Sequence, residues 1–268
     1  MSSPTILITG ATDGIGKQTA LELAERGFRV LVHGRSESSA SRACAEILSL
    51  VPSATVETVH ADLSSLAAVR DLATTVRRIA PHLHVLVNNA GVYMNEFRLS
   101  ADGVEMTFAV NHLAHFLLTN LLLDVLRAGS PARVVTVSSV AHTRGALDLR
   151  DVNAKPGFSP YGAYAASKLA NVLFSNALAR RTKGDGITSN ALHPGVITTK
   201  LLKAGFNMTG ASVQQGAATS VFLASSPQVE GVTGRYFVDK RETASSPLSH
   251  NERLQEELWL ESARITGL

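Results

Sequence analysis

The stretch Thr5-Ile6-Leu7-Ile8-Thr9-Gly10-Ala11-Thr12-Asp13-Gly14-Ile15-Gly16 decides the fold of this chain. A short apolar run ends at Thr9, a glycine-rich turn follows at once, and a helical pattern begins at Gly16. Glycines let the backbone turn sharply and approach a pyrophosphate, and the N-terminus of the following helix stabilises the phosphate charge. The stretch therefore predicts a strand, a phosphate-binding turn and a helix. A glycine-rich turn without a ligand is the plain alternative.

A P-loop is the nearest rival of this interpretation, because Gly16-Lys17 resembles the end of that motif. Ala11 stands at the first glycine position, and Gln18 stands where a magnesium-binding Ser or Thr is needed. We therefore assign the turn to a dinucleotide. Its candidate cofactor-binding residues are Gly10, Thr12, Asp13, Gly14, Ile15 and Gly16.

Short β-rich runs alternate with helical patterns along the rest of the chain. The expected strands are Thr5–Thr9, Arg29–His33, Thr55–His60, Leu83–Val87, Arg133–Val137, Ile187–Leu192 and Arg235–Val238. The expected helices are Gly16–Arg26, Ser38–Leu50, Ser64–Ile79, a long one over Ala101–Arg127, then Pro160–Arg181, Ser212–Ala224 and Asn251–Arg264.

These strands are continuously apolar, which indicates burial on both faces. We expect an α/β chain with a single-domain Rossmann fold over residues 1–268: a doubly wound parallel sheet of about seven strands with helices on both faces. Two long irregular stretches, at about residues 141–159 and 199–211, are expected to be substrate loops, because long loops in compact domains are often functional.

Composition excludes several classes of function. The 268 residues include 45% hydrophobic residues, enough for a large core, and the net charge of +3 is spread without a Lys/Arg run, so we expect no nucleic-acid partner. The single cysteine, Cys44, excludes an intrachain disulfide and a Cys-based zinc site, and we expect no metal. The start, MSSPTILITG, resembles no signal peptide, and no apolar run is long enough to span a membrane, so we expect a cytoplasmic protein without a membrane partner.

The Pro160–Arg181 helix carries a candidate acid–base pair. Tyr164 and Lys168 are four residues apart and so lie on one face, one turn from each other. An ammonium about 4 Å away contributes roughly 4 kcal/mol at an effective dielectric of about 20, enough to lower a phenol pKa from about 10 to near 7. That value suits a general acid or base. A solvated lysine beside a half-buried tyrosine is the alternative.

Further candidates follow other predicted strands. Arg35 stands about 20 residues after the glycine turn, where a site for NAD usually has Asp or Glu, and an arginine there can pair with a phosphate. This favours NADP (NADPH) over NAD, although a surface arginine without a role is the alternative. Asp62-Leu63 ends the third strand, where the carboxylate can accept from an adenine amino group or cap the next helix. Asn89, Ala90 and Gly91 form a tight turn that lets backbone lie against a flat ligand.

The ordered set TGATDGIG, DL, NNAG, VNH, VSS, YAASK and HPGVITT strongly resembles the short-chain dehydrogenase/reductase family, from about Thr5 to the chain end. Within it, YAASKLANVLFSNALARR, ALHPG and TGRYFVD resemble the retinol-dehydrogenase-like branch. Ser139 and Tyr164 are 25 residues apart, more than in many family members. This spacing marks residues 141–159 as an insertion near the substrate mouth.

The resemblance implies a hydride transfer between nicotinamide and a carbonyl or alcohol substrate. By position, Asn111 matches the asparagine that holds a water on a proton path, and Ser139 the serine that bonds the substrate carbonyl, with Ser138 as its competitor. Tyr164 matches the residue that gives or takes the hydroxyl proton, and Lys168 the lysine that lowers its pKa and binds the ribose. The residues implied to shape the nicotinamide pocket are Pro194, Gly195, Val196 and Thr199, with Thr198 a competitor of Thr199.

The resemblance also implies a small-molecule partner and a homodimer or homotetramer, because family members pair through the equivalents of the two long helices, which here have excess apolar surface. Phe158, Leu201, Phe206 and Met208 suit an apolar substrate pocket. A dinucleotide-binding scaffold or sensor without turnover is the alternative function. An epimerase or dehydratase is a further one, but such enzymes generally have a larger C-terminal domain.

Overall fold

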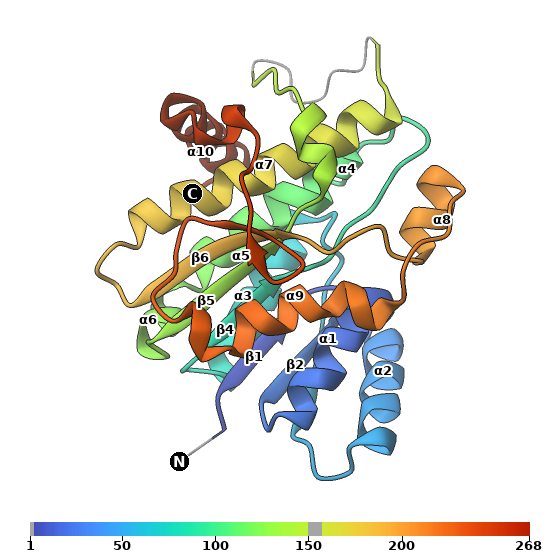
Figure 1. The fold of residues 1–268 in the computed structure, drawn as a ribbon, viewed down its shortest axis with the longest axis vertical. Coiled ribbons are helices and arrows are strands. Elements are labelled where there is room, and N and C mark those ends of the chain that lie inside the picture. The colour runs from blue at the N-terminus through green and yellow to red at the C-terminus, as the bar shows by residue number, and fades with distance from the viewer. Residues whose placement is uncertain (1–2, 150–156) are drawn as a thin grey trace.

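The computed structural model describes residues 3–149 and 157–268. Its centre is one sheet in the order β3-β2-β1-β4-β5-β6-β7-β8, in which only the last pair of strands is antiparallel (Figure 1). The strands are β1 (Thr5–Ile8), β2 (Arg29–Gly34), β3 (Val56–His60), β4 (Val85–Asn88), β5 (Ala132–Val137), β6 (Ile187–His193), β7 (Tyr236–Val238) and β8 (Arg241–Glu242). The predicted doubly wound parallel sheet is confirmed, and β8 is a two-residue addition at its edge.

The strand order reverses between β1 and β4. Ile6 of β1 lies beside Val30 of β2 on one side and beside Val85 of β4 on the other. All four residues of β1 are buried, as expected for a strand covered on both faces. In such sheets, ligands bind in the crevice at the carboxyl ends of the strands where the order reverses. The topology therefore points to the glycine turn that follows β1.

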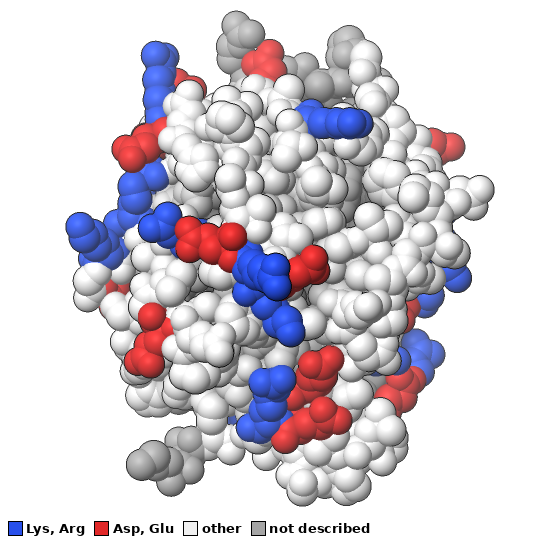
Figure 2. All heavy atoms as spheres, in the orientation of Figure 1, with Lys and Arg blue, Asp and Glu red and all other residues white. Residues whose placement is uncertain are grey.

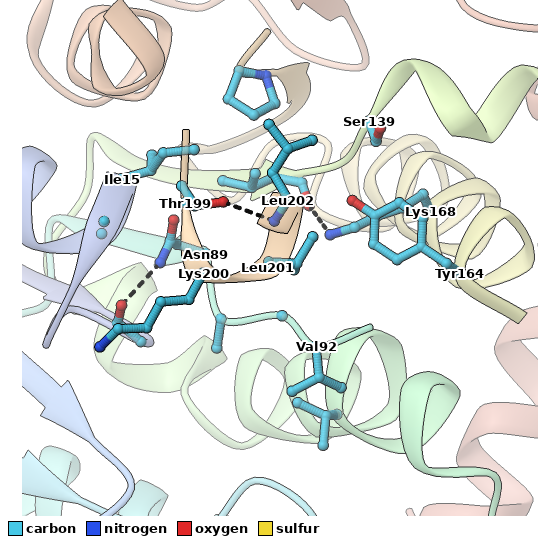
Figure 3. A pocket seen from close by; sticks show the side chains of 18 of the residues that line it. Ile15, Asn89, Val92, Ser139, Tyr164, Lys168, Thr199, Lys200, Leu201 and Leu202 are labelled. Carbon is cyan, nitrogen blue, oxygen red and sulfur yellow. Dashed lines mark hydrogen bonds between the residues drawn. The ribbon is translucent and has the colours of Figure 1, made fainter. Parts of the chain in front are cut away.

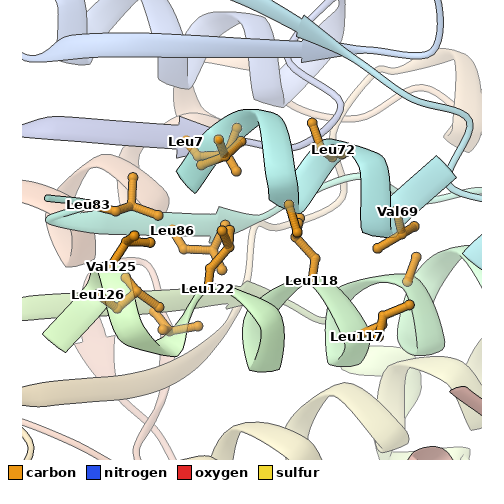
Figure 4. Packing of buried hydrophobic residues seen from close by; sticks show 14 of the residues in the cluster. Leu7, Val69, Leu72, Leu83, Leu86, Leu117, Leu118, Leu122, Val125 and Leu126 are labelled. Atoms are coloured by element: carbon orange, nitrogen blue, oxygen red, sulfur yellow. The ribbon is translucent and has the colours of Figure 1, made fainter. Parts of the chain in front are cut away.

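Helices cover both faces of the sheet (Figure 1). One layer consists of α1 (Gly14–Glu25), α2 (Glu37–Leu50) and α9 (Val213–Ser225), and the other of α3 (Leu66–Ile79), α5 (Ala114–Leu121) and α7 (Pro160–Arg181). The second layer holds the larger of the two main apolar clusters. There Leu72 of α3 and Leu117 and Leu118 of α5 pack towards the sheet residues Leu7 and Leu86 (Figure 4).

The prediction of one long helix over Ala101–Arg127 is wrong. The Glu105 carboxylate accepts hydrogen bonds from the backbone N–H groups of Thr107 and Phe108, both at 2.8 Å, so the helix begins only after it. The segment then divides into α4 (Met106–Phe108), a π-helical turn (Ala109–Leu113), α5 and α6 (Leu123–Ala128). The widened turn contains Asn111, the candidate that a regular helix would disfavour.

The stretch 199–211, expected to be irregular, contains the helix α8 (Lys200–Phe206). The Thr199 hydroxyl caps it by accepting from the Leu202 N–H at 3.2 Å, and Asn207 ends it in the left-handed conformation. Seven residues are too few for a clear helical period, which is why the sequence pattern missed it. In the other expected loop, Val140–Arg144 forms a 3-10 turn, whereas residues 150–156 lie outside the described part of the chain.

The C-terminal helix α10 (Glu252–Thr266) covers α5 and α7 (Figure 1). Its Trp259 packs edge-on against Phe116 at 4.9 Å between ring centroids and stacks on Phe174 at 5.8 Å. The Arg181 guanidinium lies 4.3 Å from the centroid of the Trp259 ring. The chain itself therefore covers part of the apolar surface of α5 and α7 that we attributed to a partner copy.

Charges of both signs are mixed over the face shown in Figure 2. Several charged residues of the protein form ion pairs, among them Arg29 with Glu57 and Arg127 with Asp185, at 2.7 and 2.8 Å. Within residues 3–149 and 157–268, no helix has the length and apolar character needed to cross a membrane.

The larger core cluster allows a test of how much one of its buried side chains contributes to stability. Leu117→Ala should lower the free energy of unfolding by about 2–5 kcal/mol, because a fully buried side chain leaves a cavity when it is truncated. Leu50→Ala is the matched control, since Leu50 is 67% exposed, and it should change the free energy by no more than about 0.5 kcal/mol. Urea unfolding followed by circular dichroism measures both. Equal effects of the two substitutions would contradict the assignment of this core.

Candidate active site

A cavity of about 820 Å³ opens at the carboxyl ends of the strands (Figure 3). Almost every residue singled out from the sequence lines it. Those residues are Gly10, Thr12, Asp13, Gly14, Ile15, Gly16, Arg35, Asp62, Leu63, Asn89, Ala90, Gly91, Ser139, Tyr164, Lys168, Pro194, Gly195, Val196 and Thr199. Asn111 lies behind the cavity wall instead.

The glycine turn after β1 is interlocked with the turn after β4. Gly10 has φ +63°, and a Cβ on it would lie 2.9 Å from the Cα of Ala90. A Cβ on Gly16 would lie 2.3 Å from the Gly10 carbonyl oxygen and 2.4 Å from Asn89 Nδ2. The Asn89 amide donates to the carbonyls of Thr9 and Gly10, at 2.8 and 3.2 Å. Glycine is thus required at both positions by the backbone or by the packing.

Asp13 connects the glycine turn to α8. Its Oδ1 accepts from the Gly14 N–H at 2.8 Å, and its Oδ2 lies 2.7 Å from Lys200 Nζ. The hydrogen bond to Lys200 and the one from Gly14 outweigh burial and lower the carboxyl pKa. The acidic group at the phosphate end of the turn is therefore paired with a lysine.

His33 is a pocket residue that the sequence pattern did not reveal. The Gly10 N–H donates to its Nδ1 at 3.1 Å, so Nε2 carries the proton and donates to the Ala61 carbonyl at 3.2 Å. Burial lowers the His33 pKa to about 4, so the ring is neutral at pH 7. The ring ties the glycine turn to the end of β3. Nothing in the sequence pattern distinguishes it from other strand histidines.

Arg35 and Asp62 lie at the ends of β2 and β3. The Asp62 Oδ1 accepts from the N–H and the hydroxyl of Ser64, at 2.9 and 2.8 Å, whereas Ser65 caps α3. Burial raises the Asp62 pKa, but the bonds from Ser64 and the charge of Arg35 outweigh it and the net pKa is lowered. Arg35 is exposed on the pocket wall.

Tyr164 and Lys168 extend from the first turns of α7 into the cavity (Figure 3). Ser159 caps this helix, accepting from the Gly162 N–H at 3.2 Å, and Pro160 follows it. The Lys168 Nζ donates to the Val137 carbonyl at 3.0 Å and lies 5.6 Å from the centroid of the Tyr164 ring. Both side chains are buried.

The predicted lowering of the Tyr164 pKa is not found in this arrangement. Burial raises the Tyr164 pKa to about 12, although a hydrogen bond with Ser139 opposes the shift. Burial also lowers the Lys168 pKa to about 8. The prediction took the attraction of an ammonium about 4 Å away to outweigh burial, whereas burial has the larger effect on the pKa of both groups. At pH 7 the phenol is neutral and the ammonium is charged.

The two adjacent serines after β5 point to different places. The Ser138 hydroxyl donates to the Lys168 carbonyl at 2.7 Å and is buried. Ser139 caps the 3-10 turn, accepting from the Ala141 N–H at 3.2 Å, and it lines the cavity together with Tyr164, whose pKa it lowers. Of the two, Ser139 therefore has a hydroxyl beside the tyrosine.

Asn111 uses its side-chain amide within the protein. Its Oδ1 accepts from the Val92 N–H at 2.8 Å, and its Nδ2 donates to the Val92 carbonyl and to the Ser167 hydroxyl, both at 3.0 Å. It thereby fixes the segment after Gly91 to α7. A Cβ on Gly91 would lie 3.6 Å from Lys168 Nζ and 3.5 Å from Asn111 Oδ1, so glycine keeps the space in front of these groups open.

The segment after β6 forms the opposite wall. Gly195 has φ +95°, and Thr199 begins α8 at the cavity edge. Thr198, its competitor, bonds with both backbone groups of Gly210, at 2.8 and 2.9 Å. The Thr198 hydroxyl is thus occupied in holding the loop.

Two aromatic rings, those of Tyr93 and Phe206, pack against the Tyr164 ring. Tyr93, which the sequence pattern did not single out, lies 5.4 Å from Tyr164 and 5.0 Å from Phe206 between ring centroids. Phe206, Leu201 and Met208 line the cavity as expected for an apolar site, whereas Phe158 packs against Phe97. This end of the cavity is apolar, and the glycine-turn end presents backbone N–H groups and Arg35. The donor set fits a dinucleotide at one end and an apolar molecule at the other.

Comparisons with known proteins identify the family of this chain. Residues 4–209 match the family model described as short chain dehydrogenase. Retinol dehydrogenase 13 of Mus musculus is 41% identical over an aligned length of 280 residues. This alignment covers 98% of this chain and 84% of that protein.

Two solved structures share the fold over most of their length. A crystal structure of an uncharacterized protein from Mycobacterium Paratuberculosis has a TM-score of 0.82 and 33% identity, covering 99% of this chain and 94% of the other. The Pseudomonas aeruginosa RhlG/NADP active-site complex has a TM-score of 0.72 and 25% identity, covering 88% and 94%. The chain is therefore an oxidoreductase that belongs to the short chain dehydrogenase family.

Proposed function

We propose that this chain is an NADP(H)-dependent enzyme that transfers a hydride between nicotinamide and an apolar carbonyl or alcohol substrate. The observation that carries the proposal is a single cavity that holds the glycine turn and Arg35 at one end and Ser139, Tyr164 and Lys168 at the other. The chain acts as one domain over residues 1–268, with substrate loops at about 141–159 and 199–211. In this proposal α8, within the second loop, covers the substrate.

The chemistry divides between cofactor and protein. A bound nicotinamide supplies or accepts the hydride. The Ser139 hydroxyl and the Tyr164 phenol bond the substrate oxygen, and Tyr164 gives it a proton during reduction. A neutral phenol beside a charged Lys168 suits this direction, because the ammonium stabilises the phenolate that remains. Asn111 holds the Val92 segment in place behind the reacting groups.

Two features support an apolar substrate. The rings of Tyr93 and Phe206 pack against the Tyr164 ring, and the Tyr161 ring packs against Phe206. The relative named retinol dehydrogenase acts, by its name, on an apolar alcohol. Aromatic and aliphatic walls with few polar groups are typical of such sites.

Arg35 and the strand end that lacks a carboxylate support NADP. An exposed guanidinium at the end of β2 can form two charge-assisted hydrogen bonds with a 2′-phosphate. Ser36, the N-cap of α2, follows directly and adds a hydroxyl at a helix N-terminus.

A homodimer or homotetramer and a cytoplasmic location stay predictions. Any pairing would need a face other than the surface of α5 and α7 that α10 covers.

Tyr164→Phe should lower turnover of an aldehyde and ketone panel by at least about 100-fold, because it removes the proton that the substrate oxygen receives. NADPH binding, measured by fluorescence titration, should stay within about threefold of wild type. Tyr161→Phe is the matched control, since Tyr161 lines the same cavity one turn earlier and should retain most activity. Equal losses of turnover in both variants would contradict the assignment of Tyr164 as the proton donor. A wild-type protein that binds NADPH without turning over any substrate would favour the scaffold alternative.

Arg35→Gln should weaken NADPH binding by about 10-fold to 100-fold and leave NADH binding nearly unchanged, because only NADPH has the 2′-phosphate. Arg42→Gln is the control for net charge, since Arg42 is an exposed arginine on α2, the helix that begins shortly after Arg35. Fluorescence titration of each variant with both cofactors measures the effect. Tighter binding of NADH than of NADPH by the wild type would overturn the cofactor assignment.

A further inference from the structure

His142 lies in the 3-10 turn Val140–Arg144, three residues after Ser139, and is 2% exposed. Its two ring nitrogens bond to backbone groups far apart in the sequence. Nδ1 lies 2.7 Å from the Ser139 carbonyl oxygen, and the Ser246 N–H donates to Nε2 at 3.0 Å. The ring also packs on Tyr236 of β7, with 4.7 Å between centroids. We name this arrangement the His142 bracket.

The partners fix the protonation state of this ring. A backbone N–H can only donate, so Nε2 must be unprotonated to accept from Ser246. A backbone carbonyl can only accept, so Nδ1 must carry the proton and donate to Ser139. His142 is therefore a neutral imidazole in one tautomer. Burial lowers its pKa, partly opposed by the Ser139 carbonyl, in agreement with the neutral form.

The bracket connects the C-terminal segment to the reacting groups. Ser246 lies directly before the 3-10 turn Pro247–His250, which contacts α7 and α10. Ser139, at the other end of the bracket, lines the same cavity as Tyr164 and lowers the pKa of that phenol. The Ser139 carbonyl also accepts from the His142 N–H at 3.1 Å, so the imidazole supplies the shorter of its two bonds. The orientation of Ser139 thus depends on a ring held by a distant segment.

We propose that His142 is a positioning residue that orients Ser139 toward the substrate by bridging it to the C-terminal segment at Ser246. The proposal rests on the proposed function, because it concerns the serine of that reaction. It makes two separable claims: the bond from Nδ1 serves turnover, and the bond to Nε2 serves the anchoring of the C-terminal segment.

Several titratable groups surround the bracket. Tyr236 faces the ring from β7, His193 of β6 lies close enough for His142 to lower its pKa, and Tyr164 and Lys168 of α7 lie near these two in turn. His250, on the following turn, bonds with Ser245 rather than with the ring. Protonation of Nε2 would place its N–H opposite the Ser246 N–H, so two donors would face each other and the hydrogen bond would be lost. The stabilising effect of the bracket should therefore be complete above about pH 6.5 and be lost as the pH falls toward the lowered pKa of the folded state.

Two substitutions separate the claims. Asparagine places an N–H donor where Nδ1 lies but cannot reach Ser246, and glutamine can reach Ser246 with an acceptor but loses the donor to Ser139. His142→Asn should keep kcat/KM within about threefold of wild type and lower Tm by roughly 2–8 °C. His142→Gln should keep Tm near wild type and lower kcat by about tenfold or more. NADPH binding by fluorescence titration should be unchanged in both.

The pH profile supplies a second readout. The wild-type Tm should fall on the acid side as Nε2 is protonated and the bond from the Ser246 N–H is lost, and the Tm of His142→Asn should fall less steeply because its amide does not titrate. Nitrogen NMR of the imidazole should report the Nδ1–H tautomer at pH 7.

Different results would contradict the positioning role, the bracket and the proposed function. Equal kcat values in the two variants, or losses of activity that follow Tm, would overturn the positioning role, and an Nε2–H tautomer would overturn the bracket itself. Absence of turnover in the wild type would overturn the proposed function instead, and the positioning role with it.

Discussion

The hydroxyl of Thr9 joins the two halves of the sheet at the point where the strand order reverses. It accepts hydrogen bonds from the N–H groups of Asn89 and Ala90 at 2.9 and 3.0 Å. With both of these accepted, it donates its own hydrogen to His115 Nε2, which lies 2.9 Å from the Thr9 oxygen. The other ring nitrogen, Nδ1, then carries the proton and donates a hydrogen bond to the Asn111 carbonyl at 3.0 Å. One side chain directly after β1 thus sets the position of the turn after β4 and, through a histidine, of the π-helical turn. The rest of the site is built on this junction.

Buried neutral histidines recur around the cavity. His33, His115 and His142 each use one ring nitrogen as a donor and the other as an acceptor, and burial lowers the pKa of each. A neutral imidazole links two backbone or hydroxyl groups without adding charge to a region of low dielectric. The positive potential next to Tyr164 therefore comes from Lys168, whose ammonium is itself held by a carbonyl. Rigid positioning and charge are supplied by different residues.

The sequence predicts the sheet and the contents of the cavity well, for one physical reason. Parallel strands that are apolar throughout must be covered on both faces, and their carboxyl ends meet at one edge, so residues such as Arg35, Asn89 and Gly195 converge there. Contacts between distant segments leave no such local pattern. The break in the helix around Asn111, the place of Tyr93 and the covering of α7 by α10 depend on tertiary packing. The Tyr164 pKa depends on burial, which spacing along a helix does not reveal.

The interlocking of Gly16 with Asn89 and of Gly10 with Ala90 has a consequence for how this site can vary in evolution. A side chain at position 16 would meet a backbone oxygen as well as the Asn89 amide, so no change at position 89 alone could make room for it. Epistasis is therefore built into the pair of turns: each restricts which substitutions the other tolerates. A lineage that altered one turn would have to alter the other at the same time, and a graft of the cofactor turn into another sheet would have to carry both.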